Sequence, residues 1–202
     1  MGRDLYCTIT GMRHGNAAPP ASEGDFRTVD LPRPLTELGV SQVDRRRKLL
    51  GERRYSTVIS SIAARARETA RLVTKRGEDC MHILPCLYTP EGPDGDIMER
   101  DYQRYGSKSP SYYLGHDFDG VYSKFMRVAG AEIAPFVMPE GDLIMFGHTP
   151  FTNLAVLGTL RALTVEVARH IADAILGFEL PEAGAFTVYV KEGEVVEFAI
   201  HG

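Results

Sequence analysis

Two histidines stand beside glycine in the sequence, and both have residue types around them that suit chemistry on an anion. The first lies in Arg13-His14-Gly15 and the second in Gly147-His148. A neutral imidazole can act as a nucleophile, and an adjacent guanidinium can hold an anion. Glycine lets the backbone turn close to a bound ligand. The two segments therefore predict a site where an anion is held against a nucleophilic imidazole.

An arginine on a predicted helix adds a second cation to this set. Arg65 follows Ser60-Ser61 and shares one helical stripe with Thr69 and Val73. Arg67 and Arg71 fall on the opposite side of the same helix, where we expect solvent. An arginine that points inward needs an anionic partner, so Arg65 is a candidate anion ligand.

Apolar runs of strand length alternate with helical patterns along the chain. Strands are expected at 5–10, 55–60, 80–84, 142–146, 185–190 and 194–200, helices at 36–53, 64–76, 118–136, 151–160 and 165–176, and loops at 17–34 and 89–96. This alternation predicts an α/β fold, a three-layer sandwich with a mostly parallel central sheet. Helices should cover both faces, and the last two strands should form an antiparallel edge.

Such a fold explains how residues far apart in sequence could meet. Ligands of open α/β sheets bind beyond the carboxyl ends of the strands. Arg13, His14, Arg65 and His148 all follow predicted strands closely. Together they predict a pocket for a dianionic phosphoryl group, which guanidinium contacts can neutralise without a metal.

Length and composition narrow the remaining possibilities. The chain has 202 residues, 44% hydrophobic and 25% charged, which predicts one globular domain over residues 1–202. Its net charge of −4 argues against nucleic-acid or membrane partners. No run approaches the length of a membrane-spanning helix, and Cys7, Cys80 and Cys86 lack metal-ligand spacing. We therefore expect a cytoplasmic protein that uses no metal and no cofactor.

Four motifs carry a resemblance that covers nearly the whole chain. They are MRHGNA, LTELGVSQV, SSIAARARETARLV and GHTP. In order and in strand context, they resemble the histidine phosphatase superfamily, the phosphoglycerate-mutase-like group. The spacing of the third motif and the short length look most like the small, capless branch that includes bacterial phosphohistidine phosphatases.

The resemblance implies a function and a role for each matched residue. His14 would be the nucleophile of a metal-independent phosphomonoester or phosphoramidate hydrolase that forms a phosphohistidine intermediate. The residues implied to bind the phosphoryl group are Arg13, Asn16, Arg65, His148 and Thr149. For His14 to attack through one ring nitrogen, the other should donate to a nearby backbone carbonyl. The substrate would be a phosphorylated small molecule or a phosphoprotein.

The proton donor to the leaving group is the weakest part of the match. Some relatives carry an acid directly after the second histidine, where this chain has Thr149-Pro150. The 89–96 loop offers Glu91, Asp94 and Asp96, of which Glu91 is the expected donor.

Other functions fit parts of the same sequence. Cys7 and Arg13 have the spacing of cysteine-dependent phosphatases, although Cys7 lies inside an apolar run. GHTP also occurs in metallophosphatases, but the paired ligand motifs of a dinuclear site are missing from the sequence. A phosphoester-binding regulator with weak turnover and a phosphoglycerate-type mutase are the remaining alternatives.

Overall fold

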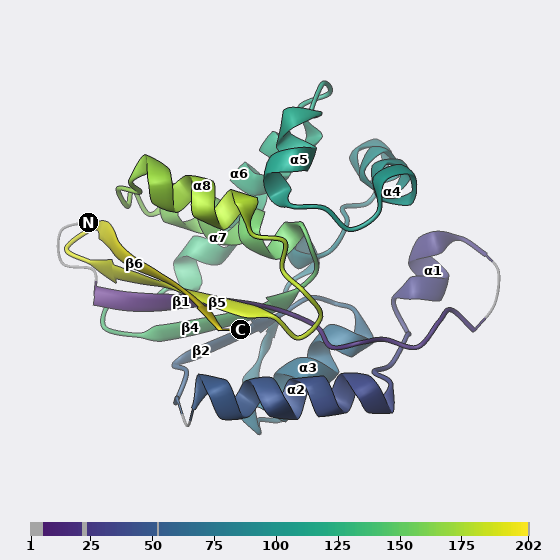
Figure 1. The fold of residues 1–202 in the computed structure, drawn as a ribbon, viewed down its shortest axis with the longest axis horizontal. Coiled ribbons are helices and arrows are strands. Elements are labelled where there is room, and N and C mark those ends of the chain that lie inside the picture. The colour runs from purple at the N-terminus through teal and green to yellow at the C-terminus, as the bar shows by residue number, and fades with distance from the viewer. Residues whose placement is uncertain (1–5, 22–23, 52, 202) are drawn as a thin grey trace.

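The computed structural model describes residues 6–21, 24–51 and 53–201, and within them six strands form one sheet (Figure 1). The strands are β1 (Tyr6–Arg13), β2 (Thr57–Ser60), β3 (His82–Ile83), β4 (Asp142–Gly147), β5 (Ala185–Lys191) and β6 (Glu194–His201). Their order is β3-β2-β4-β1-β5-β6, with the first four parallel. β5 and β6 are antiparallel at the edge, as predicted.

Helices cover both faces of the sheet. They are α1 (Phe26–Asp30), α2 (Glu37–Leu50), α3 (Ala64–Thr74), α4 (Pro93–Tyr105), α5 (Pro110–Gly115), α6 (Val121–Ile133), α7 (Phe151–Ala162) and α8 (Arg169–Gly177), with 3₁₀ turns η2 (Glu78–Cys80), η3 (Pro85–Leu87) and η4 (Ala134–Phe136). In Figure 1, α2 and α3 lie on one face and α6, α7 and α8 on the other, while α1 and α4 lie beyond the sheet. The predicted three-layer α/β fold is confirmed.

The central strand β4 shows why the strands of the sheet are runs of apolar residues in the sequence. Leu143 and Met145 belong to the core cluster that includes residues of α6 and α7. Ile144 and Phe146 belong to the cluster that includes residues of α2 and α3. Successive side chains of a strand point to opposite faces, so a strand covered on both faces buries every residue.

Three elements have bounds that differ from the predicted ones. β1 continues past Gly11 to Arg13, which pairs with Gly147 of β4. The strand expected at 80–84 is only His82–Ile83 long. The helix expected from residue 165 begins at Arg169, because Glu166 pairs with the end strand at Glu194.

Two helices lie where loops were predicted. In 17–34, Asp25 caps α1 by accepting a hydrogen bond from the Thr28 N–H. In 89–96, Gly92 has a φ of +80° and precedes Pro93, the first residue of α4. Proline and acidic residues are typical of turns and equally of helix starts, so these residues did not separate the two.

No helix among the described residues has both the length and the apolar character needed to cross a membrane.

Candidate active site

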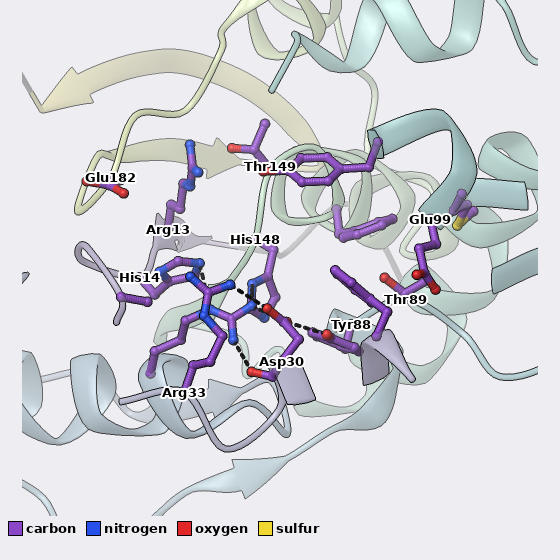
Figure 2. Close-up of a pocket in the computed structure, with 16 residues that line it drawn as sticks. Arg13, His14, Asp30, Arg33, Tyr88, Thr89, Glu99, His148, Thr149 and Glu182 are labelled. Carbon is purple, nitrogen blue, oxygen red and sulfur yellow. Dashed lines mark hydrogen bonds and ion pairs between the residues drawn. The ribbon is translucent and has the colours of Figure 1, made fainter. Parts of the chain in front are cut away.

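A cavity of about 190 Å³ lies at the carboxyl ends of β1, β2 and β4 (Figure 2). Its lining residues are Arg13, His14, Ala17, Phe26, Asp30, Arg33, Arg65, Tyr88, Thr89, Met98, Glu99, Tyr102, His148, Thr149, Phe151 and Glu182. Both predicted histidines and both predicted arginines are among them. The sheet edge expected from the sequence is therefore the edge at which these side chains meet.

His14 is fixed in one tautomer by its own loop. Its backbone N–H donates to the Gly147 carbonyl at 3.2 Å, next to the end of β4. Its Nδ1 donates to the Gly15 carbonyl at 2.6 Å, which leaves the lone pair on Nε2. A Cβ at Gly15 would lie 2.6 Å from the Gly39 carbonyl oxygen, so only glycine fits against the start of α2. The expected hydrogen bond from His14 to a nearby backbone carbonyl is therefore present.

Arg65 joins the two histidines. Its Nε donates to Nε2 of His14 at 3.1 Å, and its Nη2 donates to Nδ1 of His148 at 3.4 Å. The two imidazole rings are 4.9 Å apart between centroids. With Nδ1 accepting, Nε2 of His148 donates to the Ser61 hydroxyl at 2.9 Å, and that hydroxyl also accepts from the Ala63 N–H. Arg65, His14 and His148 therefore form one connected group.

Burial and positive charge keep both imidazoles neutral. Burial and the neighbouring Arg65 together lower the pKa of His14 to about 3. Burial, Arg65 and His14 lower the pKa of His148 well below its usual value. Both rings are consequently uncharged at neutral pH, the state in which an imidazole can attack phosphorus.

These buried rings predict a loss of stability at acid pH. In the unfolded chain both histidines bind protons near pH 6.5, while the folded protein binds none until well below it. The unfolded state therefore binds more protons below pH 6.5. Each ring should lower the free energy of unfolding by up to about 1.4 kcal/mol for each pH unit by which the pH falls. We expect urea unfolding between pH 7 and pH 5 to show this slope. His148→Gln should flatten the slope, whereas replacing the exposed His170 should leave it unchanged.

Asp30, at the end of α1, accepts hydrogen bonds from Arg65 and so holds it in place. Its carboxylate accepts from Nη2 of Arg65 at 2.6 Å, from Nη1 of Arg33 at 2.6 Å and from the Tyr88 hydroxyl. Its carbonyl accepts from Nη1 of Arg65 at 2.7 Å. Burial opposes the charge of Asp30, but Arg65 and these hydrogen bonds outweigh it and lower the pKa. Asp30 is 2% exposed and ionised, and it fixes the plane of the Arg65 guanidinium.

The other predicted phosphate ligands lie around this group without contacting it. Nη1 of Arg13 donates to the Leu180 carbonyl at 3.0 Å, and the Thr149 hydroxyl donates to the same oxygen at 2.8 Å. Nε of Arg13 is buried and has no hydrogen-bond partner among the described residues. The Asn16 amide donates to Glu182 at 3.0 Å and lies outside the cavity lining. Arg13 thus has a buried N–H available for a ligand.

The three carboxylates predicted as proton donors lie outside the cavity lining. Glu91 is 82% exposed on its side chain and pairs with Nη2 of Arg27 at 3.2 Å. Asp94 pairs with Lys124 at 2.5 Å, and Asp96 is exposed in the first turn of α4. Asp94 and Asp96 lie in the first turn of the helix that begins at Pro93, and a loop prediction could not anticipate their positions.

Glu99, one turn further along α4, lines the cavity instead. Partial burial raises its pKa, and the negative charges of Asp25 and Asp96 raise it further. Another carboxylate of the lining, Glu182, accepts hydrogen bonds from the side-chain amides of Asn16 and Gln42. The predicted loop ended at residue 96, so no sequence pattern indicated Glu99 as a site residue.

Cys7 cannot serve as a nucleophile in this arrangement. It lies in β1, is 6% exposed, and packs in the core cluster of the α6 and α7 face. Burial raises its pKa to about 11, so the thiol stays protonated. Among the described residues, no group of three or more His, Cys, Asp or Glu side chains is placed to hold a metal ion.

One family model matches part of the chain. Residues 9–91 match the family model described as histidine phosphatase superfamily, branch 1. The matched segment contains Arg13, His14, Asn16 and Arg65, while His148 lies beyond it.

Solved structures of phosphatases and a mutase share the fold. A phosphoserine phosphatase from Entamoeba histolytica, solved with 3-phosphoglyceric acid, is 15% identical, with 96% of each chain covered and a TM-score of 0.58. A phosphoglycerate mutase from Bacillus anthracis is 17% identical, with 98% of this chain and 93% of that chain covered and a TM-score of 0.59. The protein histidine phosphatase SixA, solved with tungstate, is 20% identical, with 96% of each covered and a TM-score of 0.50.

A curated sequence match is partial. It joins 121 residues, 51% of this chain, to the chloroplastic chlorophyll a-b binding protein CP29.3 of Arabidopsis thaliana at 26% identity. The chain spans 44% of that relative's length. At this identity and coverage, the match gives no basis for assigning the function of that relative to this chain.

Proposed function

We propose that this chain is a member of the histidine phosphatase superfamily, whose model matches residues 9–91, and that it hydrolyses phosphomonoesters through a phosphohistidine on His14. The observation that supports the proposal most directly is the tautomer of His14 and the position of its Nε2. Its Nδ1 proton is held by the Gly15 carbonyl, and its Nε2 lone pair faces the cation of Arg65. A phosphorylated small molecule is the proposed substrate, and a phosphoramidate is the alternative because its nitrogen leaving group needs an acid less.

In the first step, Nε2 of His14 attacks phosphorus and the bond from phosphorus to the leaving oxygen breaks. Arg65 and His148 stabilise the equatorial oxygens, and the unpartnered Nε of Arg13 adds a donor. To bind, the phosphoryl group replaces the contacts that Arg65 makes to the two imidazoles. In the second step, water attacks phosphorus, the bond to Nε2 breaks, and inorganic phosphate leaves.

We assign the acid to Glu99 in place of Glu91. Glu99 lines the cavity and has a raised pKa, whereas Glu91 is exposed and paired with Arg27. Glu99 gives its proton to the leaving oxygen in the first step and takes a proton from the attacking water in the second.

The proposal is tested by phosphate release from a simple phosphomonoester in the presence of a chelator. We expect turnover to survive EDTA and to survive Cys7→Ser, since neither a metal nor the buried thiol takes part. Tight binding of inorganic phosphate without turnover of any substrate would favour a regulatory protein. Transfer of phosphate to an organic acceptor in preference to water would favour a mutase.

The acid assignment predicts a difference between two neighbouring glutamates. Glu99→Gln should lower kcat for an alkyl phosphate by about 100-fold, because the alkoxide then leaves without a proton. For p-nitrophenyl phosphate, whose leaving group needs no acid, the loss should be small. The wild-type rate should fall as pH rises through the raised pKa of Glu99, and this alkaline limb should vanish in Glu99→Gln. Glu91→Gln is the matched control, and equal losses in the two variants would contradict the assignment.

A further inference from the structure

The cavity has two chemically different ends. Its three cations are Arg13, Arg33 and Arg65. Arg13 and Arg33 lie near the histidines in Figure 2, and Arg65 donates hydrogen bonds to both imidazoles. The rest of the lining includes apolar and aromatic side chains, and Thr89 and Glu99 lie past Tyr88 in Figure 2. The phosphoryl group belongs at the cationic end, so the leaving group of a substrate must lie against the other end.

The far end is formed by Phe26, Tyr88, Met98, Tyr102 and Phe151, which we call the aromatic wall. Tyr88, Met98 and Phe151 are 3%, 1% and 8% exposed and are already covered by the core. Tyr102 is 39% exposed and Phe26 is half-buried, so both have apolar surface that a ligand could cover. Burying that surface would favour an apolar ligand.

Charge at this end acts against an anionic leaving group. Arg65 and Arg33 are held by Asp30, and Nη1 of Arg13 is held by the Leu180 carbonyl, all at the phosphoryl end. A carboxylate on the leaving group would meet Glu99. The arginine next to the aromatic wall, Arg27, lies 5.4 Å over the Tyr88 ring, but it is paired with Glu91 and does not line the cavity. Moving a carboxylate into such surroundings without a partner is costly.

Size sets a further limit. The cavity of about 190 Å³ is a little larger than the roughly 150 Å³ cavities that accept a benzene molecule in other proteins. A phosphoryl group and one ring therefore fill it, while a larger leaving group would extend into solvent.

From this wall we infer that the preferred substrates are small phosphomonoesters whose leaving group is an uncharged aromatic or apolar alcohol. The inference rests on the proposed phosphatase function and adds the substrate class. Phosphorylated sugar acids and amino acids should be poor substrates, because they lack a ring for the wall and carry a carboxylate.

Three alkyl phosphates test the inference, because each releases an alkoxide: benzyl phosphate, glycerol phosphate and 3-phosphoglycerate. We expect kcat/KM to fall in that order, with benzyl phosphate at least about tenfold above glycerol phosphate. Tyr102→Ala should lower kcat/KM for benzyl phosphate about tenfold through KM and leave glycerol phosphate within twofold. Phe118→Ala, which removes a 90% exposed aromatic ring outside the cavity, is the control and should change neither.

The outcomes distinguish a wrong substrate class from a wrong phosphatase function. If 3-phosphoglycerate or glycerol phosphate is hydrolysed as well as benzyl phosphate, the substrate class is wrong and the phosphatase function stands. If Tyr102→Ala slows all three esters equally, the wall does not select the leaving group. If none of the three is hydrolysed and p-nitrophenyl phosphate is not hydrolysed either, the proposed function itself fails.

Discussion

Replacing His14 by alanine is expected to lower kcat for phosphomonoester hydrolysis by about 10⁴-fold or more. The variant lacks the nucleophile, and the remaining donors can only bind the phosphoryl group and stabilise its charge. Arg65 and His148 stay in place, so affinity for inorganic phosphate or tungstate should change much less than kcat. The measurement is steady-state kinetics together with anion binding by calorimetry.

Two controls make this result specific. His170→Ala removes an exposed histidine on α8 and should keep full activity. Thermal unfolding of His14→Ala should show a folded protein, because the ring makes its hydrogen bonds to its own loop and to Arg65. A folded His14→Ala variant that still turns over at one tenth of the wild-type rate would be incompatible with the proposed nucleophile.

Replacing Arg65 by alanine is expected to have the second largest effect, on catalysis and on stability together. Arg65 lies between both imidazoles and is the buried cation nearest the proposed phosphoryl site, so kcat/KM should fall by about 10³-fold. Asp30 would then be a buried carboxylate without this partner, and the free energy of unfolding should drop by about 3 kcal/mol. Kinetics and urea unfolding measure the two effects.

The two effects of this substitution can be separated. Adding Asp30→Asn to Arg65→Ala removes the uncompensated charge and should restore part of the stability without restoring activity. Arg71→Ala, on the exposed side of the same helix, should change neither quantity. A double variant that recovers turnover along with stability would mean that Arg65 acts only as a structural ion-pair partner.

Much of the site was predictable because strand ends determine where side chains meet. His14 and His148 follow β1 and β4, and the alternation of strands and helices predicts that both lie at the carboxyl edge of one parallel sheet. The direct pairing of β1 with β4 is a finding of the structure. The position of Arg65 follows from its helical stripe, since the inward side of α3 faces the sheet. The tautomer of His14 followed from chemistry, because an attacking nitrogen requires its ring partner to donate elsewhere.

The remainder depends on contacts that no local pattern encodes. Asp30 lies 35 residues before Arg65, in a short helix within a segment that reads as a loop. Glu99 reaches the cavity only because α4 starts at Pro93, and Gly-Pro-Asp is as typical of a turn as of a helix start. The aromatic wall comes from α1, α4, α7 and the residue that follows η3, so its existence depends on tertiary packing.

The most direct test of the account is the site of phosphorylation during turnover. The enzyme would be quenched in base within milliseconds of mixing with substrate, digested, and mapped by mass spectrometry under conditions that preserve phosphoramidates. We predict an acid-labile phosphate on His14, absent from unreacted enzyme and discharged when substrate is exhausted. An acid-stable phosphate on another residue, or turnover with no phosphoenzyme at any quench time, would contradict the central claim.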